Sequence, residues 1–124
     1  AVANDYHYEE IFSKLEKEGE NNPEFSIPKD IGKSYARICK DYNPIHVSNI
    51  AAKLFGYKKS IAHGMWVLSR ALAESEISTD TKRVDAAFKG PAFTESLATV
   101  IQQDKDLNVF CGKNPRPIML IHYE

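Results

Sequence analysis

Asp41 and His46 are the residues whose types and spacing most suggest chemistry. They stand five positions apart in the stretch DYNPIH, residues 41–46, and include an Asn-Pro step between them. Because Pro44 favours an extended conformation in the residue before it, we expect a sharp path that turns both side chains back into one pocket. A carboxylate and a neutral imidazole that share one water molecule can polarise it for attack and return the proton to carbon. The pair therefore predicts an acid/base site for the addition or removal of water.

Asn43 lies between these two residues and offers a side-chain amide that can orient either group or the water. The alternative interpretation is structural. Asp41 would cap a turn, and His46 would be an ordinary loop histidine with its hydrogen bonds satisfied. On spacing alone, the structural interpretation is the commoner outcome.

The stretch IAHGM, residues 61–65, is a second candidate feature. Gly64 stands at the expected start of an apolar helix, where free backbone N–H groups and the positive end of the helix dipole point outward. Such a terminus can accept a thioester carbonyl oxygen and stabilise the enolate formed when a nucleophile adds to a conjugated double bond. Alternatively, Gly64 only permits tight helix packing and His63 only begins the helix. Met65 and Trp66 either line an acyl path or belong to the core.

The elements that must position these residues are helices first and strands afterwards. Helical spacing and capping residues predict helices over 6–19, from Pro28 to before Pro44, over 48–55 and over 63–76, with the polar stretch ENNPEF as a linker. Strands are predicted in RVDAAFK, ESLATVIQ, LNVFC and PIMLIHYE, which turn residues separate. This order favours an α+β fold in which one long helix is wrapped by a curved antiparallel sheet, with successive strands paired as neighbours.

Length and charge limit the function classes. The 124 residues, 43% of them hydrophobic, suffice for one core, so we expect an N-terminal extension over residues 1–25 and a single domain over 26–124. With 16 basic and 17 acidic residues, the net charge of -1 gives no argument for nucleic acid or an anionic membrane. The sequence shows neither an apolar run of roughly 18 residues nor a signal-peptide pattern. We therefore expect a cytoplasmic protein without membrane insertion.

Metal and disulfide chemistry are not expected. Cys39 and Cys111 are far apart and show no ligand spacing, so they are predicted to be reduced packing residues. The spacing of Asp41, His46 and His63 matches no common metal-ligand motif, so no metal site is predicted. Lys58, Lys59 and Lys89 can meet the phosphates of a nucleotide-bearing substrate, although exposed lysines are usually only solvated.

Two segments together resemble a known family. YARICKDYNPIHVSNIAA, followed by GYKKSIAHGMW, is similar to the MaoC-like dehydratases, which include the R-specific enoyl-CoA hydratases of the hotdog fold. The positions that fit the family pattern are Tyr35, Ile38, Cys39, Asp41, Asn43, Pro44, Ile45, His46 and Ala52. VDAAFKGPAF also resembles the strand that follows the family's central helix, so the resemblance covers about residues 26–124.

The resemblance implies a hotdog domain that forms a homodimer or a larger homo-oligomer. It implies that Asp41 and His46 activate water, that the Gly64 amide binds the thioester oxygen, and that Asn43, His63 and Met65 belong to the same site. It further implies reversible hydration of trans-2-enoyl thioesters, carried on coenzyme A or acyl carrier protein, to R-3-hydroxyacyl thioesters, with no metal or redox cofactor. Two alternatives stay open. A hotdog thioesterase would need a carboxylate on the central helix, and an acyl-binding subunit would need no catalytic pair.

Two departures from the family pattern stand out. Lys40 occupies the position where the family usually has Gly, which puts the shape of the loop beside Asp41 in question. The stretch Glu95-Ser96 stands where the family commonly has a Gly-Asp turn. Because of these two departures, the resemblance supports the predicted fold more directly than the predicted activity.

Overall fold

The computed structural model of the chain describes residues 22–124. The helix predicted over residues 6–19 therefore lies outside the described residues. Within residues 22–124, the helices are all too short or too polar to cross a membrane. The division into an extension and one domain stays a prediction.

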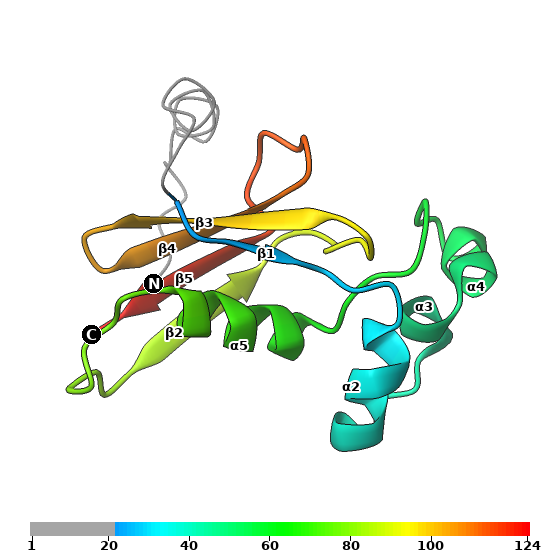
Figure 1. Cartoon of the computed structure of the whole chain (residues 1–124), viewed down its shortest axis with the longest axis horizontal. Helices are drawn as coiled ribbons and strands as arrows, with labels where there is room; N and C mark the ends of the chain where they lie inside the picture. The colour runs from blue at the N-terminus through cyan, green and yellow to red at the C-terminus, as the bar shows by residue number, and fades with distance from the viewer. Residues whose placement is uncertain (1–21) are drawn as a thin grey trace.

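A five-stranded antiparallel sheet forms the body of the molecule (Figure 1). Four of its strands are those that the sequence predicts, and their bounds are β2 Val84–Phe88, β3 Leu97–Gln103, β4 Asp106–Cys111 and β5 Met119–Tyr123. The fifth, β1, spans Glu24–Ser26 and pairs with β3. The linker interpretation of ENNPEF is therefore wrong for Glu24 and Phe25. Phe25 is buried and meets the ring of Trp66 edge-on at 5.9 Å, so one apolar residue anchors a strand too short to show alternation.

The order of strands in the sheet is β1-β3-β4-β5-β2. Strands β3, β4 and β5 form the expected meander of neighbours. The expectation fails for β2, which pairs with β5 at the far edge instead of with β3, the next strand in the chain. The crossing segment 89–96 lies against the segment that precedes the central helix, through the isolated bridge between Ile61 and Phe93.

The central helix, α5, spans Gly64–Glu74 and lies along one face of the sheet (Figure 1). Val67 and Ala71 are its fully buried residues, and they join a core built with Phe25, Val100 and Ile121 of the sheet. Leu68, Leu72 and Trp66 pack partly buried against this core. One helix against an antiparallel sheet is the predicted hotdog arrangement. Met65, for which the core was one of two expected places, is 55% exposed.

Three short helices project beyond one end of the sheet (Figure 1). Their bounds are α2 Ile31–Cys39, α3 Pro44–Val47 and α4 Asn49–Leu54. Helices α2 and α4 are predicted from the sequence, and the Ser48 hydroxyl caps α4 by accepting from the N–H of Ala51. Cys39 is exposed at the end of α2, so it is not the packing residue that the sequence suggests, whereas Cys111 is buried.

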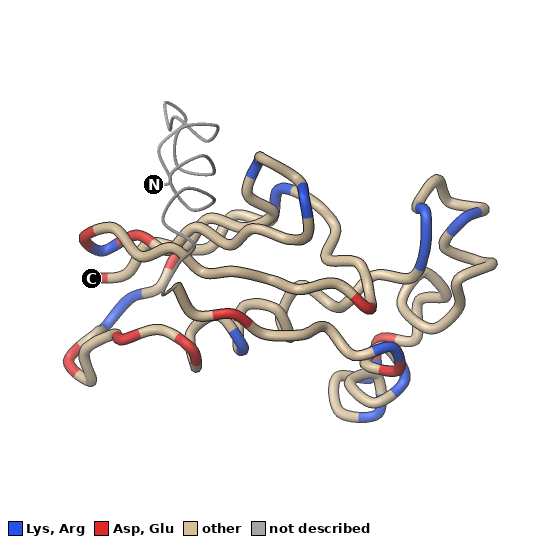
Figure 2. Tube along the Cα trace, turned by 45° about the horizontal axis from the view of Figure 1, so that its top comes forward, with Lys and Arg blue, Asp and Glu red and all other residues tan. Residues whose placement is uncertain are grey.

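Charges are unevenly distributed along the described chain. Residues 42–73, which include α3, α4 and most of α5, contain Lys53, Lys58, Lys59 and Arg70 but no aspartate or glutamate. Figure 2 shows this contrast, because the tube around α4 carries blue bands and no red ones. The end of the molecule that bears α4 is therefore positively charged, although the whole chain has a net charge of -1.

Candidate active site

The loop that carries Asp41 begins at a left-handed residue. Helix α2 ends at Lys40, whose φ of 66° and ψ of 14° are left-handed and whose N–H donates to the carbonyl of Ala36. This conformation strains a residue with a Cβ, and glycine adopts it freely. The glycine usual in the family at this position thus has a physical reason. Lys40 keeps the loop's shape at a conformational cost, and Glu95, at the other departure, likewise has a positive φ of 65°.

Replacing Lys40 with glycine should therefore stabilise the protein. We expect the free energy of unfolding in urea to rise by about 1 kcal/mol, since a left-handed residue with a side chain costs ~1–2 kcal/mol relative to glycine. Lys33→Gly is the matched control on the same helix, because Lys33 is exposed and helical. It should lower stability by about 1 kcal/mol. Equal losses in both variants would contradict the strained conformation of Lys40.

Helix α3 begins where the sequence predicts only a kinked loop. Asn43 is its N-cap and accepts, through Oδ1, a hydrogen bond of 3.2 Å from the N–H of Ile45, while Pro44 occupies the first helical position. The sharp path predicted for DYNPIH thus includes a short helix that was not predicted. An Asn-Pro step is itself a helix-start signal. Proline has no backbone N–H, and at the first helical position this costs no hydrogen bond, because an N–H there would have no partner within the helix. Asn43 contacts Asp41 through its backbone N–H, 3.1 Å from Oδ1, and its side chain is used in the cap.

Gly32 on α2 holds the backbone of α3 in place. A Cβ at this position would lie 1.6 Å from the carbonyl oxygen of His46 and 2.5 Å from its carbonyl carbon. Both atoms belong to backbone, so they cannot give way as a flexible side chain would. Only glycine allows α2 to approach His46 this closely. Gly32 is not among the site residues predicted from the sequence, because its single signal is a glycine inside an apolar helical pattern.

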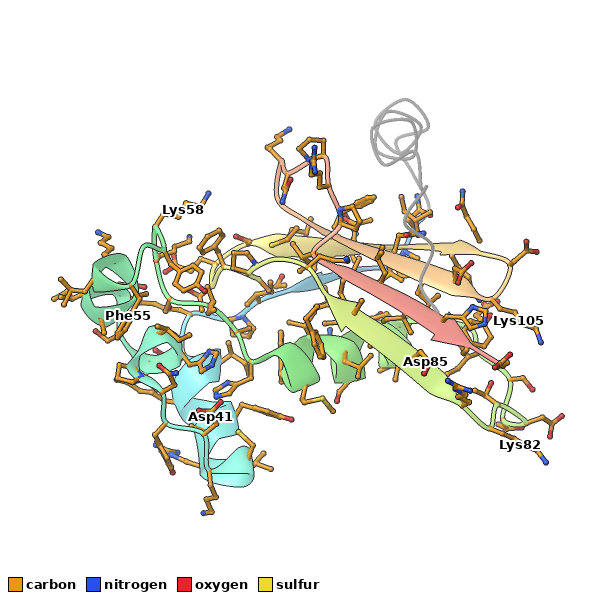
Figure 3. All side chains as sticks on the ribbon, turned by 180° about the vertical axis from the view of Figure 1, so that it is seen from behind. Asp41, Phe55, Lys58, Lys82, Asp85 and Lys105 are labelled. Carbon is orange, nitrogen blue, oxygen red and sulfur yellow. The ribbon has the colours of Figure 1, made fainter. Side chains whose placement is uncertain are left out.

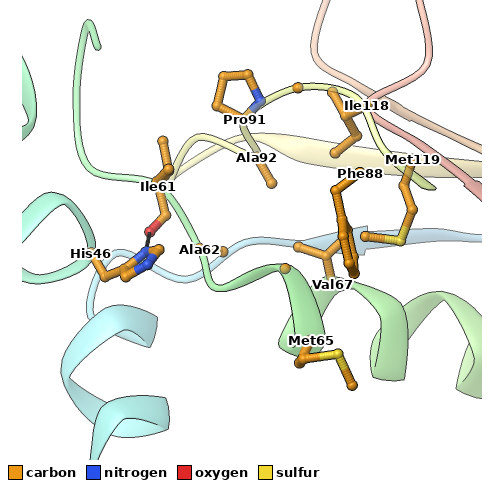
Figure 4. Close-up of a pocket in the computed structure, with 12 residues that line it drawn as sticks. His46, Ile61, Ala62, Met65, Val67, Phe88, Pro91, Ala92, Ile118 and Met119 are labelled. Atoms are coloured by element: carbon orange, nitrogen blue, oxygen red, sulfur yellow. Dashed lines mark hydrogen bonds between the residues drawn. The ribbon is translucent and has the colours of Figure 1, made fainter. Parts of the chain in front are cut away.

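The ring of His46 is fixed by a hydrogen bond to the main chain. Its Nδ1 lies 2.8 Å from the carbonyl oxygen of Ile61, and because a carbonyl only accepts, Nδ1 carries the proton (Figure 4). In the neutral ring, Nε2 is then left with a free lone pair. Nε2 stands 3.7 Å from Oδ2 of Asp41, too far for a direct hydrogen bond. Two acceptors thus face each other across a space that suits a bridging water.

His63 packs behind this pair. Its Nε2 lies 2.8 Å from the carbonyl oxygen of Asp41 and donates to it, and its ring stacks on that of His46 with centroids 3.8 Å apart. The His63 side chain is buried, and it is not part of the pocket lining described below. It therefore holds the DYNPIH loop against the start of α5. Asp41, by contrast, is exposed at the end of the molecule that carries the short helices (Figure 3).

An apolar pocket of about 370 Å³ opens beside His46 (Figure 4). We call it the apolar pocket, and its lining residues are His46, Ile61, Ala62, Gly64, Met65, Val67, Phe88, Gly90, Pro91, Ala92, Ile118 and Met119. The N–H of Gly64 is at the first position of α5, and among the described residues no group accepts a hydrogen bond from it. A Cβ on Gly64 would come within 3.2 Å of the Phe88 ring, so glycine keeps this side of the pocket open.

The structure thus brings the predicted residues together in two groups. His46, Gly64 and Met65 line the apolar pocket, and Asp41, Asn43 and His63 form the loop contacts around His46. Met65 lies on the first turn of α5, where its side chain points away from Phe88 and Met119 (Figure 4). Trp66 belongs to the core through its contact with Phe25.

Three atoms of the site also have the types that bind a transition metal. One ligand atom each from Asp41, His46 and His63 lies within 4.8 Å of the others. The Nε2 atom of His63 is already used in the hydrogen bond to the Asp41 carbonyl. The absence of a metal requirement stays a prediction.

The chain is similar to known proteins in both sequence and structure. A relative described as 3-hydroxyacyl-thioester dehydratase X of Mycobacterium tuberculosis is 38% identical over 73 residues, which cover 58% of this chain and 26% of the relative. The chain thus spans about a quarter of that relative's length. The crystal structure of HtdX from Mycobacterium tuberculosis has a TM-score of 0.69 and 28% identity, and the match covers 84% of this chain and 45% of that one.

A smaller solved structure confirms the fold over its full length. The (R)-hydratase from A. caviae involved in PHA biosynthesis has a TM-score of 0.62 at 16% identity, and the match covers 86% of this chain and 96% of that one. At this identity the likeness concerns the hotdog fold alone. A family model described as MaoC like domain matches residues 12–113, which is most of the sequence. The chain therefore belongs to the MaoC-like domain family.

Proposed function

We propose that the chain catalyses the reversible hydration of trans-2-enoyl thioesters to R-3-hydroxyacyl thioesters, carried on coenzyme A or acyl carrier protein. The observation that carries the proposal is that two acceptors and one donor, none of them with a hydrogen-bond partner among residues 22–124, lie close together. His46 Nε2 and Asp41 Oδ2 face each other at 3.7 Å, and the N–H of Gly64 lies on the same apolar pocket as His46. The name of the 38% identical relative, a 3-hydroxyacyl-thioester dehydratase, supports the same reaction class.

In the proposed reaction, a water molecule donates one hydrogen to His46 Nε2 and the other to the Asp41 carboxylate. As its oxygen bonds to C3 of the enoyl group, its proton passes to this pair, and the electrons of the double bond move to the thioester oxygen. The N–H of Gly64 stabilises the charge on that oxygen, as an oxyanion donor does. The pair then returns the proton to C2. The product contains the elements of water and no other change, so no redox cofactor is required.

Crotonyl-CoA tests the proposal directly. We expect the purified protein to remove the absorbance of its conjugated double bond and to form 3-hydroxybutyryl-CoA of the R configuration, which chiral chromatography identifies. Release of free coenzyme A without a hydroxyacyl product would indicate a thioesterase. If the protein binds crotonyl-CoA without any reaction, the result would indicate an acyl-binding subunit.

The thioesterase alternative has less support from the described residues. It needs a carboxylate on the central helix near the bound thioester, and α5 offers Glu74 at its last position. There the Glu74 carboxylate pairs with the guanidinium of Arg70 at 3.0 Å, at the end of α5 opposite to Gly64. Glu76 lies beyond the end of the helix.

The free edge of β2 supports a paired assembly. Strand β2 bonds to β5 on one side, and within residues 22–124 no strand bonds to its other side. Val84 is 39% exposed there. Because an open apolar edge favours pairing with another strand, we expect a homodimer of twice 14.0 kDa by light scattering. Val84→Lys should shift the mass toward the monomer. A monomeric unmodified protein at micromolar concentration would contradict this assembly. The cytoplasmic location likewise stays a prediction.

A further inference from the structure

A second pocket, of about 450 Å³, lies next to the apolar pocket, and Pro91 lines both. We call it the basic pocket. Its lining consists of Lys58, Pro91, Phe93, Ser96 and residues 111–114, which include Lys113. Polar and charged groups are prominent in it, in contrast to the apolar pocket beside it. The hydratase chemistry proposed above leaves this space without a use.

Two acid-free segments surround the basic pocket. Besides residues 42–73, which contribute Lys58, residues 107–123 contain Lys113 and Arg116 but no aspartate or glutamate. Both segments lie at the pocket through its lining residues. Glu95, next to Ser96, is the acidic residue nearest in sequence to the lining. The local excess of positive charge favours an anionic ligand.

The ammonium group of Lys58 is held over the pocket wall. It lies 4.8 Å from the centre of the Phe93 ring, within the range of a cation–π contact. Burial raises the pKa of the Cys111 thiol, which also lines the pocket. Hydrogen bonds from Phe93 and Ser96, together with the positive charges of Lys58 and Lys59, oppose that rise. The positive charges of both lysines therefore act on a thiol that lines the pocket.

The segment from Lys58 to Gly64 joins the basic pocket to the proposed oxyanion donor. It is held beside the segment 92–94 by the N–H of Ala62, which donates to Ala92, and by the N–H of Thr94, which donates to Ser60. Lys58 and Gly64 are six positions apart, so their Cα atoms are at most about 20 Å apart. An extended pantetheine arm, with 13 bonds from sulfur to phosphorus, spans on the order of 15 Å by the same bond geometry. A thioester at Gly64 can thus place its phosphate near Lys58.

We propose that the basic pocket binds the phosphate at the end of the pantetheine arm, with Lys58 and Lys113 as its cationic partners. The inference rests on the proposed hydratase function, because the arm is considered together with a thioester at Gly64. This phosphate is common to coenzyme A and to acyl carrier protein. The two carriers share the ligand that the pocket recognises, and they differ in what lies beyond it.

Two substrates that differ by this phosphate alone test the pocket. Crotonyl 4′-phosphopantetheine should have a KM at least ~10-fold lower than crotonyl pantetheine, because charge-assisted hydrogen bonds to phosphate strengthen binding equally in the ground and transition states. In the double variant Lys58→Gln/Lys113→Gln, this difference should disappear while kcat stays unchanged. The double variant Lys82→Gln/Lys105→Gln is the matched control, since these exposed lysines lie at the opposite end from Lys58 (Figure 3). It should retain the preference.

Failure of this inference is distinguishable from failure of the hydratase proposal. Hydration of both substrates with equal KM, or a preference that survives Lys58→Gln/Lys113→Gln, would overturn the assignment of the pocket. If no substrate is hydrated, the hydratase proposal fails, and calorimetric titration with 4′-phosphopantetheine and pantetheine still tests the pocket without turnover. Tighter binding of the phosphorylated compound, lost in the variant, supports the site.

The two possible carriers are separated by a further comparison. If the pocket binds the arm's phosphate, Lys58→Gln/Lys113→Gln should raise the KM for crotonyl-CoA and for a crotonyl-loaded acyl carrier protein alike. An effect on crotonyl-CoA alone would assign the pocket to the nucleotide and overturn the proposal for the arm.

Discussion

Asp41→Asn should lower kcat for the hydration of crotonyl-CoA by at least ~100-fold, with KM close to its original value. The amide oxygen can still accept from the N–H of Asn43, as Asp41 Oδ1 does at 3.1 Å, so the loop should keep its shape. The lost property is the negative charge that faces His46 Nε2 at 3.7 Å and helps to take the proton from water. Absorbance kinetics of the enoyl group give both constants.

The chain supplies a matched control for this substitution. Asp106 pairs with His122, with 2.8 Å between Oδ1 and Nδ1, and follows Lys105 at the end of the molecule opposite to Asp41 (Figure 3). Asp106→Asn removes the same charge from a second aspartate–histidine pair and should leave kcat unchanged. Unchanged turnover in Asp41→Asn would remove Asp41 from the mechanism, and equal losses in both variants would indicate a general effect of charge on folding.

Gly32→Ala should disable the site although alanine is the better helix former. The added Cβ would lie 1.6 Å from the carbonyl oxygen of His46, so α2 and α3 must move apart by more than about 1 Å. A misplacement of about 1 Å in an active site can lower the rate by ~10²-fold. We expect kcat to fall by about that factor. Overpacking should also lower the free energy of unfolding by about 1–3 kcal/mol.

Ser34→Ala on the exposed side of the same helix is the control for this change. It adds helix propensity without a contact to α3 and should leave stability and kcat close to their original values. If the Gly32→Ala variant is active and stable, the backbone of His46 lies farther from α2 than in this structure.

The sequence predicts the central helix and four of the five strands because their patterns are long. Residues 63–76 carry an apolar stripe over three turns, and β3, β4 and β5 are separated by strong turn signals. Strand β1 has no such pattern, because its three residues hold a single buried side chain, Phe25. The position of β2 at the far edge is a tertiary property, since β2 finds its partner β5 at the end of the chain.

The candidate site could be selected from the sequence but not assembled from it. The DYNPIH and HGM stretches identify Asp41, His46 and Gly64 through the family resemblance, and the apolar pocket brings His46 and Gly64 together. The proton position on His46 depends on the carbonyl of Ile61, fifteen residues away, which no local pattern reveals. The same is true of His63: its sequence position suggests a helix start, and it is indeed the N-cap of α5, but its ring also supports the loop.

A crystal structure of Asp41→Asn with R-3-hydroxybutyryl-CoA bound is the most direct measurement of the central claim. We expect the 3-hydroxyl oxygen to lie within hydrogen-bond distance of both His46 Nε2 and the side chain of residue 41, and the thioester oxygen to accept a hydrogen bond from the N–H of Gly64. A thioester bound elsewhere, with its 3-hydroxyl away from His46, would contradict it.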